Sequence, residues 1–138
     1  MTHHQIPLFD QPTLNTTKSQ KEAMNLAARR CGLSREEIVD RMNELASRYG
    51  VNLVSNGGLT LNTFEKWINP NELNRQMPMK ALPVFCAAVR DTLALDVIAR
   101  PVGAMVIGPE DQDLLKWARA YMAARRARRT MKTLDPEG

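Results

Sequence analysis

The stretch 59–70, LTLNTFEKWINP, constrains the fold more than any other part of the chain. Phe64, Trp67 and Ile68 fall at i, i+3 and i+4, so a helix here places three large apolar side chains on one face. Pro70 ends that helix, because the residue before a proline is pushed out of the α region. The stretch therefore predicts a short amphipathic helix that is anchored to a core by two aromatic rings and an isoleucine.

The other side of this helix is polar. Thr60 and Asn62 are both good N-cap residues, and Glu65 follows Asn62 at the spacing of a capping box. Glu65 and Asn69 border a face that carries short polar and cationic side chains, namely Asn62, Thr63 and Lys66. Side chains of this kind hydrogen-bond base edges in the major groove of DNA.

The run T-L-N-T-F-E-K-W resembles the recognition helix of Cro/repressor-type (lambda-repressor-like) helix-turn-helix regulators of phages and prophages. The flanks agree: S-R-E-E-I-V-D-R-M at 34–42 is similar to the first motif helix of that family, and M-P-M-K-A-L-P-V-F-C-A-A-V at 77–89 to the helix that follows the recognition helix. The resemblance spans roughly half of the chain. It implies an all-α fold, sequence-specific binding to double-stranded DNA, and a homodimer on a palindromic site.

The resemblance also implies roles for single residues. Asn62 and Lys66 are expected to read base edges, and Thr63 to reach a base or a phosphate. The sugar-phosphate backbone is expected to be held by Thr60, Asn69, Lys80 and Arg35.

Two features depart from the family pattern. The motif turn is usually a few residues long, whereas residues 51–58, VNLVSNGG, stand here between the helices, so either the turn is enlarged or the first helix runs long. The β-branched residues of 51–55 and the Asn-Gly-Gly turn signal are compatible with a short strand or with an extended loop. Leu61 occupies a place where a polar base-reading residue is common, and there it either touches a thymine methyl group or packs.

Apolar periodicity predicts about five helices before Gly103. Beside 59–69, they cover 19–32, 34–50, a segment after Pro78, and 91–99. Pro83 lies inside the fourth of these, so that helix either bends or starts near Lys80. Residues 104–107 form a brief apolar run that either pairs with 51–54 or contacts another subunit, so the all-α prediction leaves room for one short β element.

A long C-terminal helix is predicted from Pro109 to about Met131, because proline and acidic residues suit a helix start. Arg125, Arg126, Arg128 and Arg129 crowd its final turns. They are interpreted either as a solvated charged end or as contacts to a DNA backbone, and the helix itself is a candidate dimer surface. The predicted organisation is an arm at 1–18, a helix-turn-helix domain at 19–103, the C-terminal helix at 104–132 and a disordered tail at 133–138.

The predicted flexible arm contains QIPLF at 5–9. This run resembles the short peptide by which bacterial proteins bind the replication sliding clamp, with Gln5, Leu8 and Phe9 as the binding residues. The resemblance implies an alternative function, a protein-interaction adaptor tethered to the clamp. The other interpretation is that the apolar residues of the arm fold back on the core of the protein itself.

Composition sets limits on the class of function. The formal charge of +4 and a pI near 9.4 indicate a polyanionic partner without requiring one. Cys31 and Cys86 lie in helical apolar patterns and are expected to be buried free thiols. No internal histidine, glycine-rich phosphate loop or metal-spaced Cys/His set is present, so neither an enzyme nor a cofactor or metal site is expected. No leader or membrane span is recognised, and a cytoplasmic location is expected.

Overall fold

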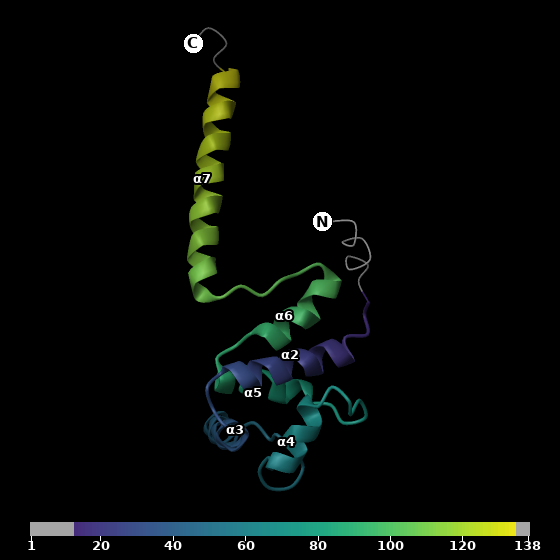
Figure 1. Ribbon diagram of the computed structural model, residues 1–138. Coiled ribbons are helices and arrows are strands. Elements are labelled where there is room, and N and C mark those ends of the chain that lie inside the picture. Colours follow the sequence, from purple (N-terminus) through teal and green to yellow (C-terminus); the bar gives the residue numbers. More distant parts are fainter. Residues whose placement is uncertain (1–12, 135–138) are drawn as a thin grey trace. The chain divides into compact units, whose positions relative to one another are not determined.

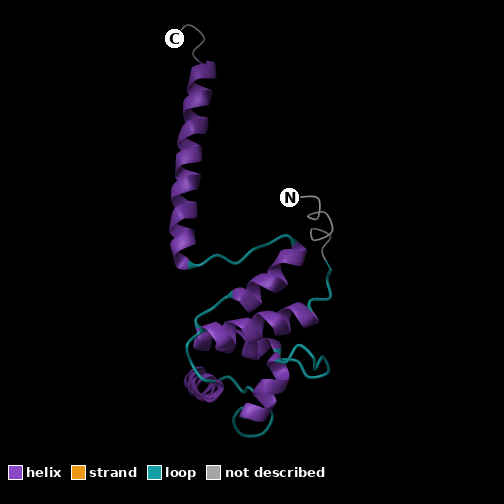
Figure 2. Ribbon diagram, viewed as in Figure 1, coloured by secondary structure: helices purple, strands orange, loops and turns teal. Residues whose placement is uncertain are grey.

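The structure, a computed structural model, describes residues 13–134 and is all-α over that range (Figures 1 and 2). The chain divides into two compact units, one up to Val106 and one from Ile107 onward. The first unit contains α2 (Thr17–Arg30), α3 (Arg35–Tyr49), α4 (Leu61–Ile68), η2 (Met79–Ala81), α5 (Leu82–Val89), α6 (Leu93–Ala99) and η3 (Arg100–Val102), and the second contains α7 (Pro109–Leu134).

Within the first unit, the helices surround one apolar core. α2 packs against α6, α3 packs against α5, and α4 contacts both α2 and α3. The rings of Phe64 and Phe85 meet at the centre with 6.0 Å between centroids and a 37° tilt, in the range that favours aromatic pairs. Ile38, Met42 and Ile68 fill the space around them and are fully buried. The large apolar residues of the predicted stripes are thus what brings α3, α4 and α5 together.

The ends of α3 follow the local sequence signals. Ser34 Oγ accepts a hydrogen bond from the Glu37 backbone N–H at 3.1 Å, and Glu37 Oε1 accepts one from the Ser34 N–H at 2.8 Å, which completes a capping box. The Ser34 N–H holds the pKa of the Glu37 carboxyl below its usual range. Gly50 ends the helix in the left-handed conformation at φ 72°, where a glycine carries no steric penalty.

Some helix boundaries differ from the prediction. α2 starts at Thr17, inside the predicted arm, and it stops at Arg30, two residues before Gly32. α7 begins at Pro109 as predicted but continues to Leu134, into the segment predicted as a tail. The sequence signals at these ends are weak, and helix ends shift easily by one or two residues.

Pro83 causes no bend, because it lies in the first turn of α5, where a backbone N–H has no helical partner in any case. The preceding residues form the separate 3₁₀ turn η2. Of the two predicted alternatives, the later helix start is therefore confirmed.

Neither 51–55 nor 104–107 forms a strand in the described part of the chain, so of the two alternatives for 51–55 the extended loop is confirmed. Local hydrogen bonds occupy backbone groups that a strand would need. The Val51 N–H donates to the Ala46 carbonyl at 2.8 Å as part of the end of α3. The Val106 N–H donates to the Asp96 carboxylate at 3.0 Å and lowers the pKa of that carboxyl.

Both cysteines are free, Cys86 buried and Cys31 only half-buried. Burial, with the nearby charge of Asp91, raises the pKa of the Cys86 thiol to about 11, so this thiol is protonated at neutral pH. Of the helices formed by residues 13–134, none combines the length and the apolar character needed to cross a bilayer.

Candidate nucleic-acid interface

The amino end of α4 is capped by Thr60. Its hydroxyl accepts a hydrogen bond from the Thr63 N–H at 3.2 Å and lies 3.1 Å from the Thr63 hydroxyl. The alternative cap at Asn62 with its Glu65 capping box is not formed, because the helix has already begun at Leu61. Thr60 thus uses its side chain within the helix, and the Asn62 side chain is left on the surface.

The two faces of α4 divide as the sequence predicts. Phe64, Trp67 and Ile68 are buried, at 0%, 5% and 1% exposure. The remaining positions are exposed or half-buried: Leu61, Asn62, Glu65 and Asn69 are exposed, and Thr63 and Lys66 are half-buried. At 100° per residue, Asn62, Lys66 and Asn69 lie on the line opposite the buried face.

The carboxyl end of α4 is held by a buried lysine of α2. Lys21 is 1% exposed, and its ammonium donates to the Lys66 carbonyl at 3.0 Å, to the Trp67 carbonyl at 2.8 Å and to the Arg75 carbonyl. A cation at this end also complements the helix dipole. Burial lowers the pKa of Lys21, and the negative charge of Glu72 opposes that shift. The position of α4 is therefore set from outside the helix as well as from its own apolar residues.

Two hydrogen bonds from the side chain of Asn43 attach the enlarged turn between α3 and α4 to helix α3. The Asn43 side-chain amide donates to the Leu59 carbonyl at 2.9 Å, and its amide oxygen accepts from the Leu59 N–H at 2.8 Å. A Cβ at Gly58 would come within 3.1 Å of the Asn43 side-chain oxygen, so the backbone at Gly58 passes close to the Asn43 side chain. Leu53 is buried and anchors the middle of the turn. Residues 51–58 are thus an ordered loop rather than an extension of α3.

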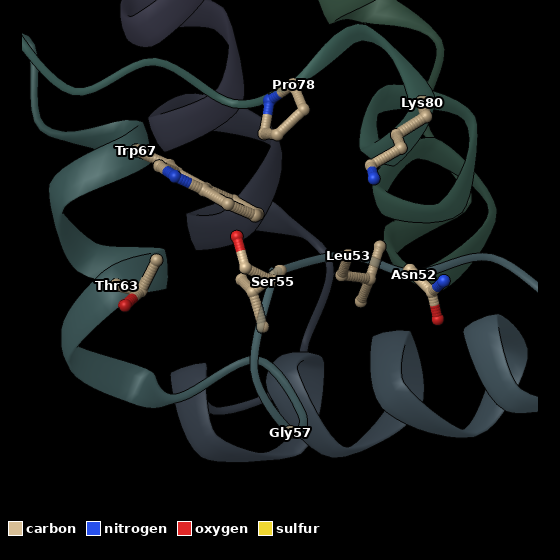
Figure 3. Close-up of a pocket in the computed structure, with 9 residues that line it drawn as sticks. Asn52, Leu53, Ser55, Gly57, Thr63, Trp67, Pro78 and Lys80 are labelled. Carbon is tan, nitrogen blue, oxygen red and sulfur yellow. The ribbon is translucent and has the colours of Figure 1, made fainter.

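This loop borders a shallow depression of about 660 Å³ on one flank of α4. Its other borders are Thr63 and Trp67 of α4, and Pro78 and Lys80 at the start of η2. Figure 3 shows Thr63 and Lys80 on opposite sides of the depression, with the Lys80 ammonium turned toward it. The residues that line it include one cation and no carboxylate, so an anion can approach this flank without repulsion from its walls.

The opposite flank of α4 has a different charge pattern. Arg35 donates to the Asn25 side chain at 2.8 Å and lies 3.6 Å from the Glu65 carboxylate. A depression of about 410 Å³ on this side is lined by these residues together with Ile68, Asn69, Lys66 and Glu72. Two carboxylates border it, and a phosphate here would have to compete with Glu65 for Arg35.

The structure therefore brings together most, but not all, of the predicted interface residues. Leu61, Asn62, Thr63 and Lys66 lie on α4 and Thr60 and Asn69 cap its two ends, with Lys80 on one flank and Arg35 on the other. The arginines of the last turns, Arg125, Arg126, Arg128 and Arg129, are exposed on α7 in the second unit. Gln5, Leu8 and Phe9 lie outside the described residues.

Three positions that order the interface were missed in the sequence. Lys21 precedes Met24 by three residues and so belongs to the buried stripe of α2, but a lysine is read as exposed by default. Asn43 sits inside a helix, where nothing in the sequence points to a contact with Leu59. Asn52 borders the depression near Lys80 and was treated only as part of a connection.

No family model matches this chain, and no curated protein and no solved structure shows significant similarity to it.

Proposed function

We propose that this protein binds double-stranded DNA in a sequence-specific manner, as a transcriptional regulator of the phage or prophage kind, with α4 in the major groove. The observation that carries the proposal is the division of α4. Three buried apolar residues and two end contacts hold the helix, while Asn62, Lys66 and Asn69 point away from the core. A helix of eight residues is long enough, since the first turns of such a helix make the base contacts.

Asn62 and Lys66 of this outward line suit base edges, whereas the Asn69 amide oxygen accepts a hydrogen bond from the Asn71 N–H at 2.9 Å and Asn69 is assigned to the sugar-phosphate backbone. Asparagine forms a bidentate pair with adenine, and lysine donates to the acceptors of guanine. Leu61, at 37% exposure beside Asn62, offers an apolar contact for a thymine methyl group. In this arrangement α4 supplies the sequence-dependent contacts.

The two flanks of α4 differ in how well they suit a phosphate. The flank with Lys80 offers a cation, the Thr63 hydroxyl and the Asn52 amide, whereas the flank with Arg35 also carries Glu65 and Glu72. We therefore place the nearer DNA strand along the Lys80 flank. In this arrangement the main role of Arg35 is to orient α4 through its ion pair with Glu65, and contact with a phosphate is secondary.

The first experiment is selection of bound sequences from random duplex DNA, followed by binding measurements on the selected site. Asn62→Ala is expected to weaken specific binding by about 1–3 kcal/mol and to relax selectivity at one base pair. Asn74→Ala, an exposed asparagine in the loop after α4, is the matched control and is expected to bind as the parent does. If no common motif is selected, or if Asn62→Ala and Asn74→Ala lose the same specific affinity, base reading by α4 is contradicted.

The second experiment separates backbone contact from base reading. Lys80→Ala is expected to weaken binding to all duplexes alike and to reduce the slope of log affinity against log salt by about 1. Lys18→Ala removes the same charge from an exposed position of α2 and should leave the slope unchanged. If the two variants behave alike, the strand does not follow the Lys80 flank.

The QIPLF motif supports a second proposal, attachment to the bacterial sliding clamp through Gln5, Leu8 and Phe9. Capture of purified clamp by the parent chain, and its loss in a Leu8→Ala/Phe9→Ala variant, would support it. DNA binding by α4 does not depend on that result, because the motif lies outside the first unit's described helices.

A further inference from the structure

The amino-terminal half of α7 has an apolar face that no described residue of its own unit covers. Trp117 is 65% exposed, Leu114 63% and Tyr121 47%, and Met122 and Leu115 are also exposed. At 100° per residue these side chains and Ala118 gather on one side of the helix. A 26-residue helix owes most of its stability to the packing of such a face, so this face is expected to have a partner.

The same face has opposite charges at its two ends. Glu110 and Asp111 lie in the first turn, and Arg125, Arg128 and Arg129 lie on the same side in the last turns. Within residues 13–134, the ion pairs of the structure all lie in the first unit, so these charges on α7 have no partner inside the helix. The face is thus complementary to a copy of itself that runs in the opposite direction.

We propose that α7 pairs antiparallel with α7 of a second copy of this chain, with the two-fold axis at Ala118. Ala118 is the midpoint of the apolar residues 114–122, and its small side chain allows the helices to approach closely where they cross. Leu114 then lies opposite Met122 and Asp111 opposite Arg125, at equal distances from the axis, and Glu110 shares one edge of the pair with Arg128 of the other copy. A parallel pair would instead place acids beside acids and arginines beside arginines.

Two contacts within α7 prepare this face for pairing. The Trp117 and Tyr121 rings are stacked, with centroids 5.6 Å apart and an 11° angle between planes, and together they form a flat apolar surface beside Ala118. The Arg125 guanidinium lies 6.0 Å from the Tyr121 ring centroid, in reach of a cation–π contact, and so is held over the same face. Both arrangements reduce the side-chain freedom that would be lost on association.

The pairing also divides the four arginines. Arg125 and Arg128 lie beside the acids of the other copy, whereas Arg126 is on the edge away from Glu110 and Arg129 lies opposite position 107, where there is no carboxylate. Only the last two remain available to a polyanion. The inference goes beyond the proposed DNA binding and does not rest on it, because the pair is measured without DNA.

The test is the molar mass of the full chain by light scattering over a range of concentrations. The parent is expected to be a dimer, E110K/D111K a monomer at the same concentration, and E110K/D111K/R125E/R128E again a dimer, because the exchange restores complementarity only in an antiparallel pair. E36K/D40K on α3 carries the same change in net charge as the first variant and should stay dimeric.

A monomeric parent, a dimeric E110K/D111K variant, or a four-fold variant that stays monomeric with parental helix content by circular dichroism would each overturn the pairing. Cysteine cross-linking locates the axis. Ala118→Cys meets its own copy and should oxidise to a linked dimer, whereas two Leu114→Cys residues lie about 12 Å apart along the axis and should not. Linkage through both Leu114→Cys and Ala118→Cys would show a parallel pair instead.

Discussion

α4 and α7 differ in what holds them. α4 has eight residues, of which three are buried, and Thr60 and Lys21 satisfy backbone groups at its two ends. α7 has 26 residues, and its large apolar side chains are exposed. Helix propensity alone would favour the longer of the two, yet tertiary contacts make the shorter one the better fixed.

The two proposals use helices that differ in how they are prepared for a ligand. α4 has its packing inside the chain and leaves only its outward side chains for recognition. α7 leaves its packing face for another molecule. Substitutions in α4 should therefore affect folding or binding according to the face, whereas substitutions in α7 should affect assembly alone.

The two tryptophans of the chain provide the largest expected contrast. Trp67→Ala leaves a cavity beside Phe64 and should destabilise the protein by about 3–5 kcal/mol. Trp117→Ala removes a side chain that is 65% exposed and should leave the unfolding midpoint of the first unit unchanged. Urea unfolding followed by far-UV circular dichroism measures the midpoint of each variant. If Trp67→Ala and Trp117→Ala unfold at the same urea concentration, the two helices do not differ in how much their tryptophans contribute to stability.

Two lysines of α2 provide a smaller contrast. Lys21→Met keeps the volume of the side chain but leaves the carbonyls at the end of α4 without a donor, at a cost of about 1–3 kcal/mol. Lys18→Met removes an exposed charge from the same helix and should change stability by less than about 0.5 kcal/mol. The same urea titration tests this. A Lys21→Met variant as stable as the parent would show that α4 does not need this contact.

The smallest effect is expected in the dependence of stability on pH. Arg30 donates to the Asp91 carboxylate at 2.7 and 3.0 Å and, against the effect of burial, lowers the pKa of that carboxyl. A carboxyl with a lowered pKa in the folded state stabilises the fold above its ordinary pKa of about 3.9, and this contribution is lost as the pH falls below it.

Asp91→Asn should therefore be less stable than the parent at pH 7, and the difference should shrink as the pH falls from about 4 toward 3. Asp40→Asn, at an exposed position of α3, should show no such convergence. The midpoint of thermal unfolding is measured at each pH. If the midpoints of the parent and of Asp91→Asn change with pH in parallel, the Asp91 carboxylate does not make the stabilising contribution assigned to it.

Much of the fold follows from local signals that could be read in the sequence. The capping box at Ser34 and Glu37, the glycine after α3, the apolar spacing of α4 and the proline that begins α7 all act within a few residues. The β-branched run 51–55 left strand and loop open in the sequence, and the loop forms because β-propensity is outweighed here by the anchoring of Leu53 and by the hydrogen bond from Val51 to Ala46.

The candidate site could be predicted only on the face of α4. The contacts of buried Lys21, the hydrogen bonds of Asn43 and the pairing of Arg35 with Glu65 join residues that are 16 to 54 positions apart. Partners at such separations have no periodic signature in one chain. The same limit applies to α7, because the complement of its face is not in its own unit.

The anchoring residues of α4 and its outward-facing residues have no member in common. Side chains at 62, 63 and 66 can therefore be exchanged as a cassette while Phe64, Trp67, Ile68 and the lysine contact keep the scaffold in place. A library randomised at those three positions should consist largely of folded proteins, so that selecting new target preferences becomes a search over surface chemistry alone.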